Sequence, residues 1–123
     1  MAEIKLIAID IDGTLVNSKK EITPAVKAAI EKAKLQNKKI VICTGRPLAG
    51  AQRYLDELKL NNQDDQYVVS FNGAVSENTN SKILFKQELN YQDYIDLEVI
   101  ARKLNLHFQA ISLDRIYTAN RDL

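Results

Sequence analysis

Short apolar runs alternate with amphipathic stretches over the first half of the chain. Residues 4–9 form a nearly continuous apolar run rich in β-branched side chains, as expected of a strand buried on both faces of a parallel sheet, and residues 39–43 have the composition of a second buried strand. Between them, residues 24–36 carry apolar side chains at helical spacing, behind Thr23 as an N-cap and Pro24 in the first turn. A strand, a helix and a strand in this order predict a right-handed crossover and therefore a parallel sheet.

The alternation continues toward the C-terminus. The remaining expected elements are, in order, a helix over 48–58, a strand over 67–71, a hairpin over 74–85, a helix from Asn90, and two strands at 107–111 and 115–118. The predicted fold class is therefore α/β, with a parallel sheet extended by a β-hairpin.

Composition and charge narrow the class of protein and of partner. The 123 residues are 46% hydrophobic and 27% charged, which is typical of a globular domain. A net charge of +1 creates no field that would favour nucleic acid or an anionic membrane, so neither partner is expected. Cys43 is the single cysteine, which excludes an intrachain disulfide and favours the reducing cytoplasm. No apolar run is long enough to span a bilayer, and no secretory segment follows Met1.

Two carboxylates stand at the end of the first apolar run. Asp10 and Asp12 are one residue apart and are followed by Gly13 and Thr14. If extended backbone continues to Asp12, both side chains project to the same side, where their repulsion keeps a proton on one of them unless cations or hydrogen bonds intervene. Such a pair suits a nucleophile and an acid/base in phosphoryl transfer, and its oxygens suit Mg²⁺. An ordinary Asp-Gly turn is the alternative interpretation.

A second group of small and polar residues follows the second expected strand. Thr44 supplies a hydroxyl, Gly45 allows close backbone approach, and Pro47 opens the next helix. This combination favours a phosphate-binding loop at a helix N-terminus, although a plain strand-to-helix turn uses the same residues. Because ligands bind at the carboxyl edge of parallel sheets, we expect this loop to lie beside the two aspartates.

Both groups of residues match motifs of one enzyme family. Residues 10–16, Asp-Ile-Asp-Gly-Thr-Leu-Val, resemble the first motif of the haloacid dehalogenase-like (HAD) phosphohydrolases. Residues 44–46, Thr-Gly-Arg, are similar to the second motif in the form used by the Cof-type branch, subfamily IIB. The resemblance implies an incomplete Rossmann-like HAD core over residues 1–86 and the beginning of an α/β cap domain over residues 87–123.

The resemblance also assigns roles to the motif residues. It implies that Asp10 is the nucleophile, through an aspartyl-phosphate intermediate, and that Asp12 is the acid/base. It implies that the Asp10 side chain and the Asp12 backbone carbonyl bind Mg²⁺ as the cofactor. Thr44 and the Gly45 amide are expected to hold the transferring phosphoryl group.

Two further residues are expected on the substrate side of the site. Arg46 belongs to the second motif, and Asn72 begins an Asn-Gly-Ala sequence that is characteristic of Cof-type phosphatases after the third strand. For each, a structural interpretation stays open. Arg46 would then be a surface arginine near a helix start, and Asn72 with Gly73 an ordinary turn.

The function that the resemblance implies is Mg²⁺-dependent hydrolysis of small phosphorylated metabolites, with sugar phosphates as the expected substrates. The sequence ends without a lysine and an acidic pair that match the third and fourth family motifs, so we expect a truncated form with little activity alone. An open sheet edge and uncovered apolar faces would favour self-association. A HAD phosphomutase and a non-catalytic fragment that binds phosphate or associates with itself are the alternatives.

Overall fold

The computed structural model describes residues 3–120, and the chain divides into two compact units, Met1–Lys86 and Gln87–Leu123. The elements of the first unit are, in order, β1 (Leu6–Asp10), α1 (Pro24–Leu35), β2 (Lys39–Cys43), α2 (Leu48–Glu57), β3 (Tyr67–Ser70), the single 3-10 turn η1 (Phe71–Gly73), β4 (Val75–Asn78) and β5 (Ile83–Lys86). The second unit contains α3 (Tyr91–Lys103), β6 (Gln109–Ile111) and β7 (Ile116–Thr118).

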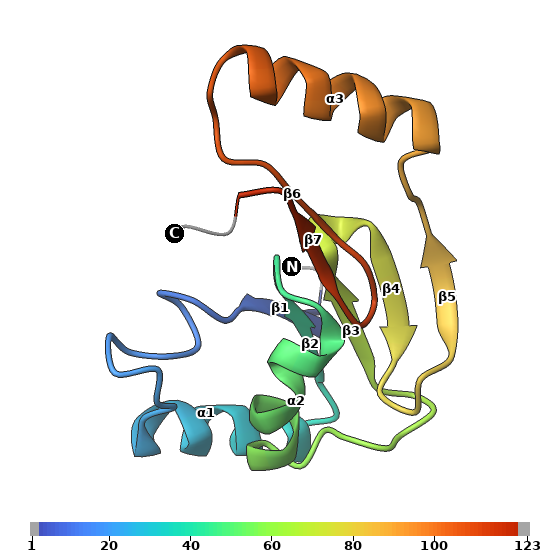
Figure 1. Ribbon diagram of the computed structural model, residues 1–123. Coiled ribbons are helices and arrows are strands. Elements are labelled where there is room, and N and C mark those ends of the chain that lie inside the picture. The colour runs from blue at the N-terminus through green and yellow to red at the C-terminus, as the bar shows by residue number, and fades with distance from the viewer. Residues whose placement is uncertain (1–2, 121–123) are drawn as a thin grey trace. The chain divides into compact units, whose positions relative to one another are not determined.

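The strands of the first unit form one sheet in the order β1-β2-β3-β4-β5 (Figure 1). β1, β2 and β3 are parallel, and β4 and β5 continue the sheet as an antiparallel hairpin. β1 pairs with β2 in register, with Leu6 opposite Lys39 and Asp10 opposite Cys43. The chain therefore leaves both strands at the same edge of the sheet, and the predicted α/β class is confirmed.

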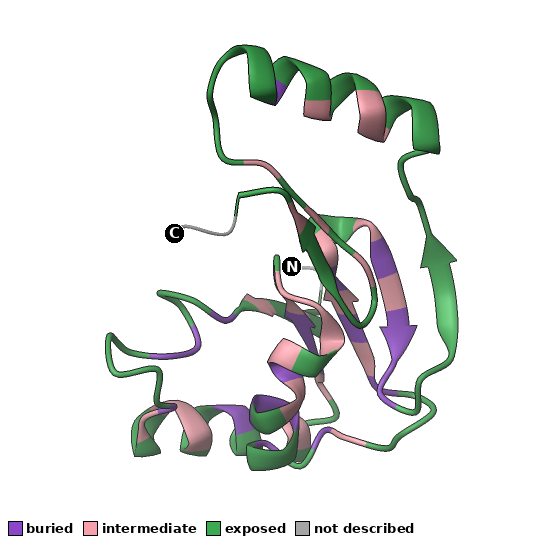
Figure 2. Ribbon diagram, viewed as in Figure 1, coloured by how far each residue is buried: buried purple, intermediate pink, exposed green. Residues whose placement is uncertain are grey.

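One face of this sheet carries the hydrophobic core. Ile40, Ile42 and Val68 from the strands pack with Ile30 of α1 and Tyr54 of α2, and each is 5% exposed or less. Strand order follows the sequence, so two right-handed crossovers bring α1 and α2 to the same face (Figure 1). Figure 2 shows buried residues on α2 and β4 and a fully exposed β5.

The opposite face of β1 is exposed, which corrects the sequence prediction. Ile7 and Ile9 are partly buried against the core, whereas Leu6 is 52% exposed and Ala8 and Asp10 are also exposed. The expectation of a strand buried on both faces is wrong because β1 is one of the two edge strands and both crossover helices cover the other face. Apolar composition alone does not distinguish these two environments.

Local signals fix the helix ends close to their predicted positions. The Thr23 hydroxyl accepts a hydrogen bond from the Val26 amide at 3.4 Å, so it caps α1 as expected. Beyond α1, Asn37 adopts a left-handed conformation with φ 57°. In the second unit, Asn90 and Asp93 form a reciprocal capping box at the start of α3.

The second unit is a helix followed by a two-stranded hairpin. β6 and β7 are antiparallel, and the ring centroids of Tyr94 and Phe108 lie 5.8 Å apart. Most of α3 is exposed, and Ala101 is its buried residue (Figure 2). No helix in the part of the chain that the structure describes has the length and apolarity that a bilayer span requires.

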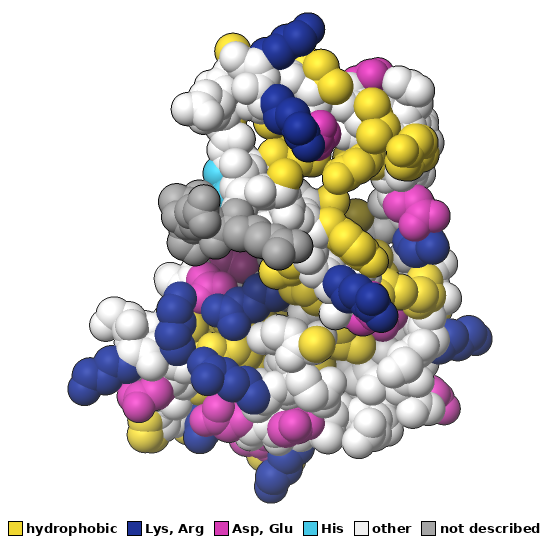
Figure 3. All heavy atoms as spheres, in the orientation of Figure 1, with side chains coloured by type: hydrophobic (Ala, Val, Ile, Leu, Met, Phe, Trp, Pro, Cys, Tyr) yellow, Lys and Arg dark blue, Asp and Glu magenta, His cyan; other side chains and the backbone are white. Residues whose placement is uncertain are grey.

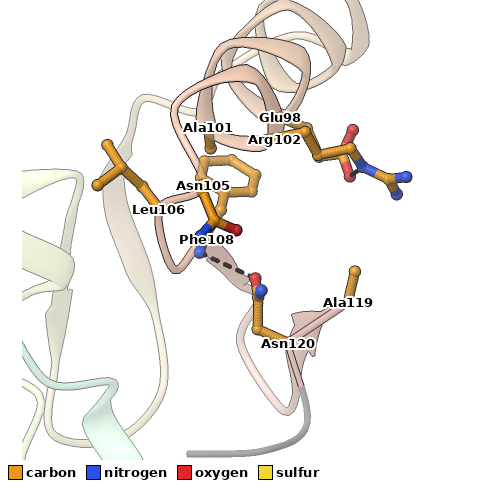
Figure 4. Close-up of a pocket in the computed structure, with 8 residues that line it drawn as sticks. All are labelled: Glu98, Ala101, Arg102, Asn105, Leu106, Phe108, Ala119 and Asn120. Carbon is orange, nitrogen blue, oxygen red and sulfur yellow. Dashed lines mark hydrogen bonds and ion pairs between the residues drawn. The ribbon is translucent and has the colours of Figure 1, made fainter.

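A small cavity lies within the second unit, near the C-terminal end of α3 (Figure 4). Its volume is about 220 Å³. Its lining residues are Glu98, Ala101, Arg102, Asn105, Leu106, Phe108, Ala119 and Asn120. Two of its polar groups are already engaged, since Arg102 pairs with Glu98 and the Phe108 amide donates to Asn120 Oδ1 at 3.3 Å.

Candidate active site

The chain turns sharply after β1 and holds its shape through buried apolar residues. Ile11, Leu15 and Val16 are each 4% exposed or less, while the intervening residues are exposed. The Leu15 amide donates to the Asp10 carbonyl at 3.0 Å, and the Val16 amide donates to the Ile11 carbonyl at 3.1 Å. This turn anchors the loop in the core and leaves Asp12 at the surface beside the end of β1.

Strand alternation would place Asp10 and Asp12 on the same side only if β1 continued to Asp12, and it does not. β1 ends at Asp10, Ile11 is completely buried, and Asp12 makes only an isolated bridge with Val16. β1 therefore ends before Asp12, and strand alternation does not by itself place the two carboxylates on the same side. Instead of a longer strand, the burial of Ile11 and the hydrogen bonds that close the following turn hold this segment.

The Asp12 carboxylate is held by two cations. Arg46 donates from Nε to Oδ2 at 2.9 Å and from Nη2 to Oδ1 at 2.7 Å, while Lys20 Nζ lies 2.6 Å from Oδ1. The hydrogen bonds from Arg46, followed by those from Lys20, lower the pKa of Asp12 to about 2. These cations stabilise the charged form of Asp12, so its carboxylate is ionised at neutral pH.

Arg46 spans the distance between the loops that follow β1 and β2. Besides Asp12, its guanidinium donates to the Gly50 carbonyl at 3.3 Å and lies 5.8 Å from the centre of the Tyr54 ring. Arg53 contacts the same ring and donates to the Lys20 carbonyl at 3.0 Å. Tyr54 is 1% exposed, so it is a core residue that supports both arginines.

The loop after β2 presents a hydroxyl and a backbone amide at the same edge of the sheet. Thr44 is buried, and its amide donates to the Val69 carbonyl at 2.9 Å. Its Oγ1 accepts from the Arg46 amide at 3.1 Å. The Gly45 amide has no acceptor among residues 3–120 and is therefore available to a ligand. Asp10 pairs with Cys43, which places these groups directly beside the end of β1.

Asn72 approaches this loop from β3. Its amide donates to the Thr44 carbonyl at 3.2 Å, and its side chain lies against Gly45. Of the six residues singled out from the sequence, Asp10 is the last residue of β1 and the other five follow the carboxyl ends of β1, β2 and β3. Whether they perform the predicted roles remains a prediction.

Lys20 is the residue that the sequence interpretation missed. It lies in a polar, lysine-rich loop, which gave no local signal of a specific contact. Its link to Asp12 spans eight residues and depends on the loop folding back, with Lys20 in a left-handed conformation at φ 61°. Only the folded loop identifies it among the neighbouring lysines.

Two oxygen donors in this region fit a magnesium ion. The Asp10 carboxylate is exposed and has no hydrogen-bond partner among the described residues, and the Asp12 carbonyl lies in the same turn. Within residues 3–120 no three acidic, histidine or cysteine side chains gather into a group that could hold a metal. Mg²⁺ commonly keeps several waters and binds through one or two carboxylates plus phosphate oxygens, so this donor set suits it.

Carboxylates, a hydroxyl and a free amide thus lie at the carboxyl edge of a parallel α/β sheet. This is the edge at which α/β proteins of this kind bind their ligands. The chain belongs to the haloacid dehalogenase-like hydrolase family, whose family model matches residues 7–122. The resemblance inferred from the two motifs is thereby confirmed.

Relatives and solved structures agree with this assignment. The chain is 43% identical over 120 residues to the Bacillus subtilis protein named "Putative phosphatase YxeH", covering 97% of this chain and 44% of that protein. It superimposes with a TM-score of 0.80 and 30% identity on a haloacid dehalogenase-like hydrolase from Bacteroides thetaiotaomicron, covering 98% and 45% of the two chains. A sugar phosphatase of HAD subclass IIB, BT4131, gives a TM-score of 0.77 at 25% identity, over 91% and 42% of the two chains. The chain thus spans between 42% and 45% of the length of these three proteins.

Proposed function

We propose that this chain carries the nucleophile, the acid/base and the phosphate-binding loop of a Mg²⁺-dependent phosphomonoester hydrolase. The observation that supports the proposal is the parallel pairing of β1 with β2, which sets Asp10 opposite Cys43 and so brings this carboxylate, the proposed nucleophile, next to Thr44 and the free Gly45 amide. Acidic and basic side chains are interspersed on the face drawn in Figure 3, which fits a local anion site better than a long basic surface.

The proposed reaction has two steps. In the first, Asp12 takes up a proton from water once its cations move to the phosphoryl group, an Asp10 carboxylate oxygen attacks phosphorus, the bond from phosphorus to the leaving oxygen breaks, and Asp12 gives that oxygen the proton. In the second, water attacks the aspartyl-phosphate, Asp12 takes a proton from the water, and the Asp10 carboxylate is restored with release of inorganic phosphate. Thr44 and the Gly45 amide orient the phosphoryl oxygens in both steps.

Mg²⁺, held by the Asp10 carboxylate and the Asp12 carbonyl, would offset the negative charge of the phosphoryl group when bound. Both Asp12 oxygens already accept hydrogen bonds from Arg46. Proton transfer to a leaving oxygen therefore requires one of these bonds to be exchanged. An anionic phosphoryl group competes for the same two cations, Arg46 and Lys20, and provides that exchange.

We favour sugar phosphates as the substrate class. We propose the cytoplasm as the location of the protein. Support comes from the neighbour described as a HAD subclass IIB sugar phosphatase. A second relative, 31% identical, is the 5-amino-6-(5-phospho-D-ribitylamino)uracil phosphatase YcsE of Bacillus subtilis, whose named substrate carries a phosphorylated ribityl group. Both names describe small phosphorylated metabolites with a polyhydroxylated carbon chain.

Hydrolysis of p-nitrophenyl phosphate by the purified chain, with Mg²⁺ and with a chelator, tests this proposal. We expect slow, Mg²⁺-dependent release of phosphate that Asp10→Asn reduces to background. Asp65→Asn is the matched control, because Asp65 is an exposed aspartate paired with Lys39 in the same unit. With glucose 6-phosphate as the probe, free phosphate is the expected product, and an isomerised sugar phosphate would indicate a phosphomutase instead. Hydrolysis that is undiminished by Asp10→Asn would contradict the proposal.

A further inference from the structure

The turn that follows β3 adopts a backbone conformation that needs support. Phe71, Asn72 and Gly73 have successive φ values of 52°, 56° and 95°. Glycine adopts positive φ freely and asparagine tolerates it, whereas the bulky side chain of Phe71 disfavours it. A run of left-handed residues persists only where neighbouring contacts determine it, and such strain is concentrated at functional positions.

Those contacts are made with the loop that follows β2. The Phe71 amide donates to the Arg46 carbonyl at 3.1 Å, and the Asn72 amide donates to the Thr44 carbonyl at 3.2 Å. In the opposite direction, the Thr44 amide donates to the Val69 carbonyl at 2.9 Å. The left-handed turn therefore extends the hydrogen bonding between β2 and β3 beyond the strands, onto the 44–46 loop.

Gly45 is matched to the side chain of Asn72. A β-carbon at position 45 would lie 2.6 Å from Asn72 Oδ1, 3.3 Å from Cγ and 3.5 Å from Nδ2. The φ angle of Gly45 lies outside the left-handed region, so its backbone conformation does not require glycine. A β-carbon at position 45 would therefore have to displace the Asn72 side-chain amide, so the identity of residue 45 is linked to the position of that side chain.

We propose that Asn72 is a positioning residue for the phosphate-binding loop, fixing the Gly45 amide through the contact between its side chain and Gly45 and through the turn that it occupies. The inference rests on the proposed function for the identity of the ligand. It differs from direct substrate binding, because Asn72 acts here on the loop rather than on the phosphoryl group. Its consequence is that positions 45 and 72 are energetically coupled.

A double-mutant cycle tests the coupling. Asn72→Gly removes the side chain and keeps a residue that tolerates the left-handed conformation, so it separates the contact from the backbone strain. We compare Gly45→Ala in the unaltered chain with Gly45→Ala in the Asn72→Gly background. The readouts are the melting temperature, the amide chemical shifts of Gly45 and Arg46, and the affinity for inorganic phosphate with Mg²⁺ by calorimetry.

We expect Gly45→Ala to weaken phosphate binding in the unaltered chain by on the order of tenfold more than in the Asn72→Gly background, as for coupled neighbours. The Arg46 amide shift should follow the same pattern. Equal effects in both backgrounds would overturn the inference, as would coupling in the melting temperature with no coupling in binding or in the amide shifts. If the unaltered chain binds no phosphate, the proposed function fails. The inference is then decided by the Arg46 amide shift alone: a different effect of Gly45→Ala in the two backgrounds supports it, and an equal effect overturns it.

Discussion

At the scale of single residues, the candidate site is organised by ionic contacts that cross between loops. Asp12, Arg46 and Lys20 come from two different loops and form one cluster. Asp10 stands apart from this cluster, with no hydrogen-bond partner among the described residues. The cations therefore satisfy the carboxylate that is expected to move protons and leave the expected nucleophile accessible.

A second carboxylate, Glu77 of β4, has a contrasting environment. Glu77 is 6% exposed, and burial raises the pKa of its carboxyl, an effect that the neighbouring Ser70 hydroxyl partly opposes. A raised pKa means that the folded state binds more protons than the unfolded state once the pH exceeds the ordinary glutamate value. Stability therefore falls as the pH rises through the pKa of the folded state.

We predict that Glu77→Gln stabilises the chain at neutral pH and leaves it nearly unchanged below the ordinary pKa of glutamate. The physical reason is that glutamine is not ionised at any pH and so has no buried charge to desolvate. Urea unfolding at a series of pH values measures the effect. Glu21→Gln, at an exposed position in the loop before α1, is the control. A stability difference that is independent of pH would contradict the prediction.

At the scale of elements, sequence patterns located the helices and strands but not their environments. Thr23, Pro24 and the spacing of apolar residues placed α1 within one residue of its end, because caps and periodicity are local properties. The exposed face of β1 depends on the strand order and on which face the helices cover. That is a long-range property which the composition of residues 4–9 does not contain.

In the candidate site too, local features were predictable from the sequence and long-range contacts were not. The motifs placed Asp10, Thr44 and Gly45 at one sheet edge because parallel strands end together, and the structure agrees. The contact of Lys20 with Asp12 and the fit of Gly45 to Asn72 were not predictable, since each depends on how a loop folds back across many residues. The end of β1 at Asp10 was not predictable either, because the buried Ile11 that follows it has the composition of a strand residue but begins the turn.

We propose that β1 mediates self-association of this chain. It is one of the two edge strands of the sheet, and Leu6 at its start and Ile4 just before it are 52% and 66% exposed. Exposed apolar edges pair readily with other strands unless a charge prevents it. We predict that sedimentation velocity detects concentration-dependent association and that Leu6→Lys reduces it.

Leu35→Lys is the matched control for this prediction, because Leu35 is 84% exposed at the end of α1 and lies outside the sheet. The control should associate like the unaltered chain. Association that is unchanged by Leu6→Lys, or equally reduced by Leu35→Lys, would show that the β1 edge is not the surface involved.

At the scale of the whole molecule, the chain combines a five-stranded unit that carries the candidate site with a second unit built from α3 and the β6–β7 hairpin. Family membership and the arrangement of β1 and β2 support phosphoryl transfer. The chain covers 45% of the length of two of its relatives, and the groups that we propose it supplies itself are the nucleophile, the acid/base and the phosphate-binding loop. Formation of the covalent intermediate tests these groups more directly than sustained turnover does.

The most direct measurement is mass spectrometry of the chain after brief incubation with acetyl phosphate and Mg²⁺, followed by acid quenching. Attack by the Asp10 carboxylate transfers the phosphoryl group and releases acetate, so the peptide that contains Asp10 should gain the mass of one phosphoryl group. We predict that this label is removed by hydroxylamine, is absent without Mg²⁺ and is absent in Asp10→Asn. Equal labelling of Asp10→Asn, or labelling only on another residue, would contradict the assignment of Asp10 as the nucleophile.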